Sequence, residues 1–235
     1  MKYLTLILIL IPVIVFSEIQ ENLSGNTPFV VKRLYAKGSL IFGPGFEERI
    51  LVGKGYYEDE DKDPQDIYIS PGGGTGPEAV IGYDISKLLS FEFAIGLQNS
   101  GRYIKKDNFM QFKKSVLRAS ILYRIPVEKN YTPYIGAGIS TNPSVEYVQK
   151  DPDVNDEIKY QNPVGFHLLG GAEIKAPQSP LYLFSELKLI ILGEYTIEKA
   201  TSFGSSYPTS DVVSDFRDLS GNGLQFSIGL GYYLK

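Results

Sequence analysis

The sequence contains no cysteine, no tryptophan and a single histidine, His167, among its 235 residues. Without cysteine, neither a disulfide framework nor a lipid anchor on an N-terminal cysteine can form. One histidine and no cysteine leave too few ligands for an ordinary zinc or transition-metal site. A formal net charge of −4 provides no basic surface for phosphate groups, so nucleic acid is not an expected partner. We therefore expect no metal and no other cofactor.

Long apolar runs are missing after the first 16 residues, so no later segment predicts a transmembrane helix. The apolar run from Leu4 to Phe16 follows the basic Lys2. Val15 and Ser17 are small enough for the −3 and −1 positions of a cleavage site before Glu18. This pattern predicts a signal peptide over residues 1–17, with an uncleaved N-terminal anchor as the alternative. The run is shorter than a helical span of about 20 residues, which favours the cleaved signal. Residues 18–32 are then predicted to be an N-terminal periplasmic segment.

The composition that remains favours β-structure, because 17 Tyr, 13 Phe and 24 Gly are typical of strands and turns. Apolar and polar residues alternate at period two in eight segments, each long enough for a tilted membrane strand of about 9–11 residues. The predicted strands are residues 33–43, 77–86, 90–100, 115–125, 133–146, 163–175, 181–195 and 223–234.

Long and short connections alternate between these strands without exception. The long ones are residues 44–76, 101–114, 147–162 and 196–222, and the short ones are residues 87–89, 126–132 and 177–180. Residues 33–235 are therefore predicted to be all-β: an eight-stranded antiparallel up-and-down transmembrane β-barrel with four long outer loops and three short periplasmic turns. A soluble periplasmic β-barrel that binds a small ligand is the alternative, and it requires the apolar faces to point inward.

The last predicted strand indicates which face meets lipid. Every second residue from Leu224 to Leu234 is apolar, whereas the residues between them are mostly polar or small. In a membrane barrel the apolar set faces hydrocarbon and the other set lines the lumen. Extending this register places eight charged residues inside, namely Lys37, Asp84, Glu92, Arg118, Arg124, Glu173, Glu186 and Lys188. Four basic and four acidic side chains predict a lumen closed by ion pairs, unless some of them mark strand ends in the headgroup zone.

Tyrosines near the predicted strand ends suit the aromatic girdles of a membrane barrel. The six candidates are Tyr83, Tyr123, Tyr134, Tyr182, Tyr195 and Tyr232.

Two segments resemble a known family. The run Thr132–Ile139, Thr-Pro-Tyr-Ile-Gly-Ala-Gly-Ile, resembles the "PYxGxGxG" strand of small OmpA-like and opacity-type outer-membrane barrels, and residues 223–234 look like their closing strand. Within that strand Ser227, Gly229, Tyr232 and Leu234 resemble the C-terminal signal read by the barrel-assembly machinery. The match departs from the family pattern in having leucine at position 234 and one further residue after it. The resemblance implies an outer-membrane location, with outer-membrane lipid, lipopolysaccharide and the assembly machinery as partners.

The histidine gives little support to an enzyme. Some barrels of this kind are lipid-modifying hydrolases, and the deacylases resemble a pattern with His followed two positions later by Ser. Here Leu169 stands in the position of that nucleophile, so His167 is predicted to be a hydrogen-bonded residue of the lumen. The glycine-rich residues 71–77 lack the Gly-Lys-Ser/Thr ending of a phosphate loop and predict a flexible end to the first long loop.

Charge is unevenly divided between the predicted loops. The acidic run Glu58–Asp63 is predicted to be a solvated surface, with Ca²⁺ binding as the alternative, because hard cations prefer oxygen ligands. The second loop is basic, through Arg102, Lys105, Lys106, Lys113 and Lys114, and its partners are either the acidic loop or anionic lipid headgroups.

Because the predicted strands are regular and the loops long, function is expected to reside in the loops. We predict a non-enzymatic, surface-exposed outer-membrane protein that is structural or adhesive, with host or matrix ligands at its outer loops. The alternatives are a narrow channel for small solutes, a barrel enzyme acting on lipids, and the soluble ligand-binding barrel.

Overall fold

The computed structural model describes residues 33–47, 49–51, 67–105, 108–127, 131–151, 154–176, 179–212 and 216–234. The predicted signal peptide, the predicted segment 18–32 and the acidic run at 58–63 lie outside these described residues.

Helices that could cross a membrane, judged by length and apolar character, are not found within the described ranges.

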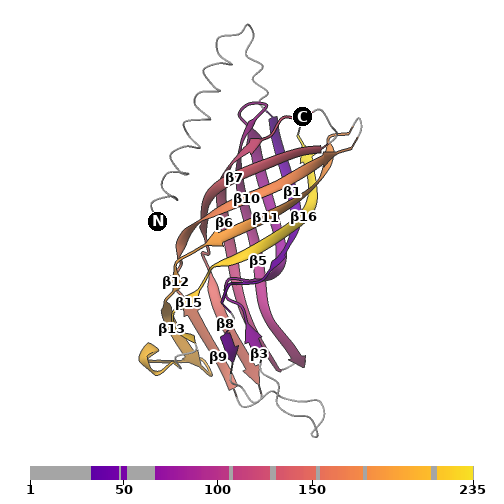
Figure 1. Ribbon diagram of the computed structural model, residues 1–235. Coiled ribbons are helices and arrows are strands. Elements are labelled where there is room, and N and C mark those ends of the chain that lie inside the picture. The colour runs from indigo at the N-terminus through magenta and orange to yellow at the C-terminus, as the bar shows by residue number, and fades with distance from the viewer. Residues whose placement is uncertain are drawn as a thin grey trace. The chain divides into compact units, whose positions relative to one another are not determined.

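Eight long antiparallel strands close into a barrel (Figure 1). They are β1 (Arg33–Gly43), β4 (Gly74–Asp84), β5 (Leu89–Lys105), β6 (Asn108–Arg124), β7 (Tyr131–Thr141), β10 (Val164–Lys175), β11 (Leu181–Ile191) and β16 (Gly223–Tyr233). Each pairs with the next of these eight along the chain, and β1 pairs with β16 to complete the ring. Closure leaves no free edge around the ring. The predicted eight-stranded antiparallel barrel is confirmed.

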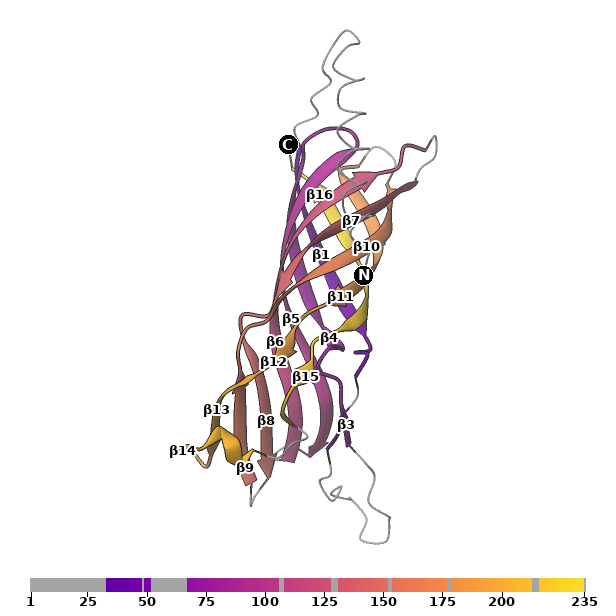
Figure 2. The ribbon, with the colours of Figure 1, turned by 60° about the vertical axis from the view of Figure 1, so that its left-hand side comes forward.

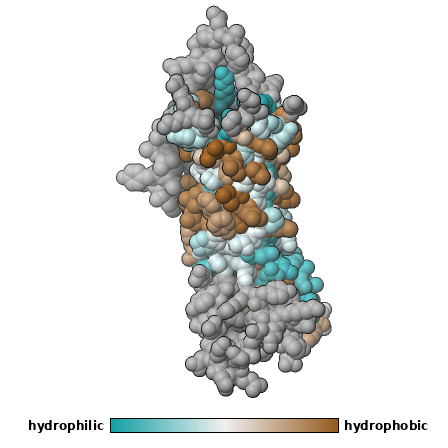
Figure 3. All heavy atoms as spheres, turned by 90° about the vertical axis from the view of Figure 1, so that its right-hand side faces the viewer, coloured by the Kyte–Doolittle hydropathy of each residue, from teal (hydrophilic) through white to brown (hydrophobic). Residues whose placement is uncertain are grey.

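Side chains of the barrel strands alternate between an apolar exterior and a polar interior. On β5, the outward residues Phe91, Phe93, Ile95 and Leu97 are between 41% and 60% exposed, whereas Glu92 points inward and is buried. On the face that Figure 3 shows, apolar side chains gather in a band between two more polar regions. A closed barrel that is apolar outside and polar inside is the arrangement of a membrane-spanning barrel. The soluble barrel, which needs the opposite arrangement, is therefore the wrong alternative.

Beyond one end of the barrel, β5 and β6 continue into an extension of the same sheet, here called the outer sheet (Figure 2). It adds β8 (Val145–Asp151), β9 (Val154–Tyr160), β13 (Ile197–Ser202) and β14 (Ser205–Tyr207) to the extended ends of β5 and β6. On β6, pairing passes from β7 to β8 between Leu117 and Lys114. The sheet thus grows out of the barrel wall without a break in β6.

Much of the sequence predicted as long loops is therefore strand, and the predicted loop bounds are wrong for residues 101–114 and 147–162. Alternation continues along β6, where Met110 and Phe112 are buried on one face. Residues 196–222 also contain β13, β14, a 3-10 turn (Thr209–Asp211) and β15 (Leu219–Ser220), which pairs with β12 (Glu194–Tyr195). In the first connection, β2 (Arg49–Leu51) pairs with β3 (Ile67–Ile69).

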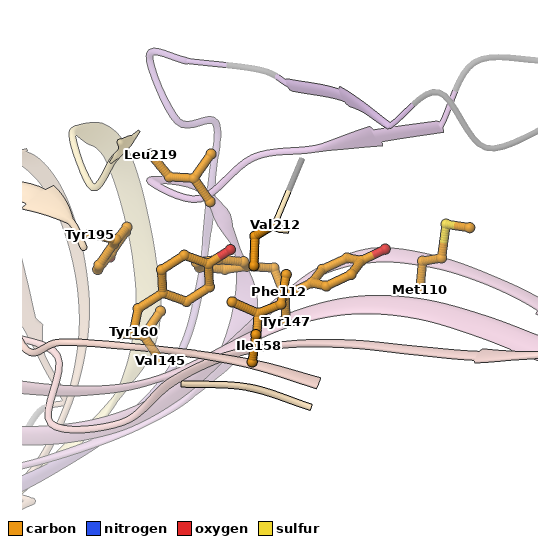
Figure 4. Packing of buried hydrophobic residues seen from close by; sticks show 10 residues of the cluster. Met110, Phe112, Val145, Tyr147, Ile158, Tyr160, Tyr195, Val212 and Leu219 are labelled. Carbon is orange, nitrogen blue, oxygen red and sulfur yellow. The ribbon is translucent and has the colours of Figure 1, made fainter. Parts of the chain in front are cut away.

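The outer sheet has its own hydrophobic core (Figure 4). Its buried members are Met110, Phe112, Val145, Tyr147, Ile158, Tyr160, Tyr195, Ala200, Val212 and Leu219, with Ile197, Tyr207 and Phe216 packed against them. Val212, Phe216 and Leu219 come from the segment after the 3-10 turn, which covers one face of the sheet. A packed core of this kind makes the outer sheet a folded unit rather than a set of loops.

Three of the six tyrosines predicted for the girdles lie elsewhere. Tyr195 is fully buried in the core of the outer sheet, and Tyr134 and Tyr182 point into the barrel. Tyr83 and Tyr232 are exposed on the lipid-facing side. The prediction is therefore wrong for the three inward tyrosines, because proximity to a strand end does not determine on which face a residue lies.

The opposite end of the barrel carries the short turns. In the first, the hydroxyl oxygen of Ser86 accepts hydrogen bonds from the backbone N–H groups of Leu88 and Leu89. Near the end of the chain, Leu234 donates its backbone N–H to the carbonyl of Leu34 (2.8 Å).

Candidate functional site

The eight charged residues predicted to line the lumen are all buried, none more than 5% exposed. At the end near the short turns, Arg124 contacts Asp84 (2.6 Å) and Glu173 (3.2 Å). Ser90, on β5, donates its hydroxyl to Asp84 (2.8 Å). Each charge in this group has a partner of opposite sign, as a buried charge requires.

Lys37 occupies the middle of the network. Its ammonium lies 2.5 Å from Glu92 and 3.3 Å from Glu186. The hydroxyl of Tyr35 donates to Glu92, and that of Tyr134 donates to Glu186, each at 2.7 Å. Lys37 thus holds two carboxylates of opposite barrel walls together, and the two tyrosines saturate them further.

From Lys37 towards the outer sheet, the network continues through Lys188, which contacts Glu186 (2.7 Å) and Glu78 (2.8 Å). Glu78 also pairs with Arg118. Arg118 donates in turn to Gln225. The chain of contacts thus passes from charged groups to neutral amides towards the outer sheet.

Two charged residues of the lumen were missed in the sequence, Glu78 and Lys114. Both are buried, and both share the parity of a predicted inward residue on the same strand, namely Asp84 on β4 and Arg118 on β6. Glu78 stands beside Pro77 at the start of a predicted strand, and Lys114 falls within a predicted loop. Continuing the period of two would have found both.

Backbone segments close the outer end of the lumen, and we call them the outer cap: Pro44–Gly45, Ser70–Gly74 and Gly221–Gly223. Side chains of β5 and β6 donate to carbonyls of the middle segment: Lys114 to Pro71 (2.7 Å), Gln98 to Gly74 (3.1 Å) and Ser100 to Ser70 (2.8 Å). The first and the third of these segments meet at a β-bridge between Gly45 and Gly223. The cap is thus hydrogen-bonded to the barrel wall and to itself.

Glycine in the cap permits this close approach. A Cβ on Gly72 would overlap the backbone carbonyl of Asn222, so no larger residue fits there. The prediction of a flexible loop end at residues 71–77 is wrong, because Gly74 already begins β4, and Gly72 and Gly73 pack against the other two segments of the cap.

His167 lies deep in the lumen between two serines. Ser120 Oγ is 2.9 Å from Nε2 and Ser140 Oγ is 2.7 Å from Nδ1, and the histidine is fully buried. Each ring nitrogen therefore lies within hydrogen-bond distance of a serine hydroxyl, as predicted for a hydrogen-bonded residue of the lumen. Among the residues that the structure describes, no group of three or more His, Cys, Asp or Glu side chains is placed to hold a metal ion.

The residues that resemble an assembly signal divide between the two faces of β16. Ser227 is buried and accepts a hydrogen bond from Lys188 (3.0 Å). Tyr232 and Leu234 are exposed on the lipid-facing side. Gly229 lies opposite Ser39 of β1, at the seam where the last strand meets the first.

The surface of the outer sheet carries charges of both signs. Lys159 lies 3.1 Å from Glu157 and 3.7 Å from Glu146. A hydrogen bond with Glu157 and the charge of that carboxylate raise the pKa of Lys159. In the core of the sheet, burial raises the pKa of Tyr147 and of Tyr160, so both phenols stay protonated in the folded sheet.

Comparison with known proteins identifies relatives by fold only. No family model and no curated protein matches the sequence. Three solved structures are similar: a major outer membrane protein from Thermus thermophilus (14% identity, TM-score 0.57), the outer membrane protein OprG from Pseudomonas aeruginosa (12%, 0.56) and Neisserial surface protein A (14%, 0.51). The matches cover 87%, 86% and 85% of this chain and 100%, 96% and 96% of those chains, in that order. With its closed ring of eight strands, the chain has the fold of the small eight-stranded outer-membrane β-barrels.

Proposed function

We propose that this chain is an outer-membrane protein whose barrel anchors the outer sheet as a rigid, surface-exposed platform for binding extracellular proteins. One contrast carries the proposal: the lumen is filled by paired side chains and capped by backbone, whereas the outer sheet is folded around a core of its own. A barrel of eight strands has room inside for side chains but little else. The surface available to a macromolecule is therefore on the outer sheet.

Location is the first part of the proposal to test. Cells making the full chain are fractionated, and the membrane fraction is run on a gel with and without boiling. We expect the chain in the outer membrane, with a shift in mobility on boiling that reports a folded barrel. Protease added to intact cells should cut only at the turns that connect the strands of the outer sheet, and nowhere in the barrel. A soluble periplasmic chain would refute the proposal.

Binding is the second part. Purified full-length protein in lipid nanodiscs is passed over immobilised fibronectin, laminin, collagen, vitronectin and fibrinogen, with empty nanodiscs as the control. We expect saturable binding to at least one of these matrix or plasma proteins. Absence of binding to every one of them would remove the adhesive function and leave a structural role in the envelope.

A narrow channel for small solutes is the second candidate, and the charged side chains that line the lumen favour it. Conduction needs the pairs around Lys37 to separate and the outer cap to move, since both obstruct the path. Single-channel recording in planar bilayers, together with solute uptake into liposomes, tests this candidate. Absence of both conductance and uptake would exclude it.

We further propose that the chain is not an enzyme and that its last strand is read during assembly. Replacing His167 by Ala should leave the lipid composition of the membrane unchanged, because the ring is closed off by two serines.

Replacing Tyr232 by Ala should slow assembly into the membrane, whereas Leu230→Ala, on the same face but outside the signal pattern, should not. Equal assembly of the two variants would contradict the role of the signal.

A further inference from the structure

The hairpin of β13 and β14, at the free edge of the outer sheet, turns through Phe203 and Gly204 (Figure 2). Ser202 pairs with Ser205, which leaves these two residues as the whole loop. Their φ angles are both positive, 48° and 80°. Two positive φ values are the mark of a type I′ turn, in which Asn-Gly is the preferred pair. Phenylalanine is strained in this conformation, because its Cβ comes close to its own carbonyl oxygen.

The surrounding structure holds the strained backbone but leaves most of the ring exposed. The N–H of Phe203 donates to the carbonyl of Asn155 on β9 (2.8 Å). Ala200 and Tyr207, on the two strands of the hairpin, pack against the core of the outer sheet. The side chain of Phe203, in contrast, is 62% exposed. A bulky aromatic residue that is both strained and solvated does little for the stability of the fold, and residues with strained backbone concentrate at functional sites.

The residues around Phe203 have the composition of a protein-binding loop. The tip Thr201–Tyr207 reads Thr-Ser-Phe-Gly-Ser-Ser-Tyr and contains no charged residue, in a chain of which 21% is charged. Charged residues are depleted in the centres of protein interfaces. Aromatic anchors among Ser, Gly and Asn recur in antibody loops, because a ring with two torsions loses little entropy and hydroxyl groups adapt to the partner.

We propose that the β13–β14 hairpin anchors an extracellular protein on the outer sheet, with the ring of Phe203 entering an apolar pocket of that partner. This inference rests on the proposed function of the outer sheet and names its binding element. A stable complex buries about 800 Å² on each partner, more than one hairpin tip provides. The footprint therefore extends to the neighbouring strand β9, which already contacts the turn through Asn155.

Two variants of the full-length protein test the anchor. Phe203→Asn removes the ring and supplies the Asn-Gly pair that the turn prefers, so it should fold at least as well as the wild type. Phe46→Ser is the matched control, because Phe46 is equally exposed at 61% but lies outside the outer sheet. Both are put into nanodiscs, checked for the gel shift on boiling, and measured against the same five matrix and plasma proteins.

We expect Phe203→Asn to weaken binding about tenfold or more, as for an aromatic hot spot, and Phe46→Ser to bind within about twofold of the wild type. Equal binding by the wild type and Phe203→Asn would overturn the anchor and leave the platform standing. Equal losses in both variants would also overturn it, because the effect would not be specific to the hairpin. A wild type that binds none of the five proteins would overturn the proposed function and this inference together.

Discussion

Replacing Lys37 by Met should destabilise the barrel more than any single change on its surface. Lys37 lies 2.5 Å from Glu92 and 3.3 Å from Glu186, and methionine keeps the length of the side chain but removes the charge. Glu186 retains Lys188 as a partner at 2.7 Å. Among the residues that the structure describes, Glu92 retains only the hydroxyl of Tyr35 (2.7 Å), and its carboxylate loses the counter-charge that Lys37 provides.

The magnitude follows from the geometry. At 2.5 Å the attraction between Lys37 and Glu92 is about 7 kcal/mol for an effective dielectric constant of about 20. The desolvation of both ions offsets much of it, by several kcal/mol per ion. Removing one partner of a buried pair nevertheless costs about 3–5 kcal/mol, because the other charge remains buried. We therefore expect Lys37→Met to lower the free energy of unfolding by about that amount.

A double-mutant cycle isolates the pair. Lys37→Met, Glu92→Gln and the double variant are unfolded with urea in lipid vesicles, and the gel shift on boiling reports the folded fraction. The double variant removes one charge of each sign, so it should be more stable than the sum of the single losses predicts, by about 2–3 kcal/mol. Strictly additive losses would refute the reasoning, because they would mean that Lys37 and Glu92 do not interact.

Two further predictions concern packing and pH. Gly82→Ala should destabilise the barrel by about 1–3 kcal/mol, because the added Cβ would overlap the ring of Tyr35. Gly38→Ala should leave the stability unchanged, because nothing lies within 4 Å of the Cβ that it adds. Equal urea midpoints for the two variants would contradict this prediction. The outer sheet should lose stability as the pH rises above about 10, because unfolded tyrosines ionise there while burial raises the pKa of Tyr147 and of Tyr160 in the folded sheet. Tyrosinate absorbance and limited proteolysis should therefore change together, and ionisation of these two residues in a protease-resistant sheet would disprove the linkage.

Much of the barrel could be predicted from the sequence, because lipid on one side and a filled lumen on the other impose a period of two on every strand. The same period of two also predicts which residues near the strand ends point into the barrel. Lys114 is four residues from Arg118 on β6 and therefore points to the same face. Tyr134 points to the face opposite that of its neighbour Ile135, which is exposed on the outside. A tyrosine suits both an interfacial girdle and a polar lumen, so residue type could not replace parity as the guide.

The outer sheet could not be predicted in the same way. Its strands alternate as the barrel strands do, but charged residues such as Lys113, Glu157 and Lys159 give residues 101–114 and 147–162 the composition of solvated loops. The pairing of β6 with both β7 and β8 is a long-range event, and no local pattern specifies it. The turn at Phe203 is hidden for another reason: the sequence predicts type I′ turns from Asn-Gly, and here the aromatic residue breaks that rule.

The lengths of the strands connect the barrel to the proposed binding surface. β5 and β6 are each 17 residues long, and β1 and β16, which remain within the barrel, are 11 residues long. Six additional residues at about 3.4 Å each extend β5 and β6 by about 20 Å. A paired and packed extension transmits the rigidity of the closed barrel to β13 and β14, which loose loops of equal length could not do. The strained turn is thus held at a fixed place outside the apolar band, where an incoming protein can reach it at little cost in entropy.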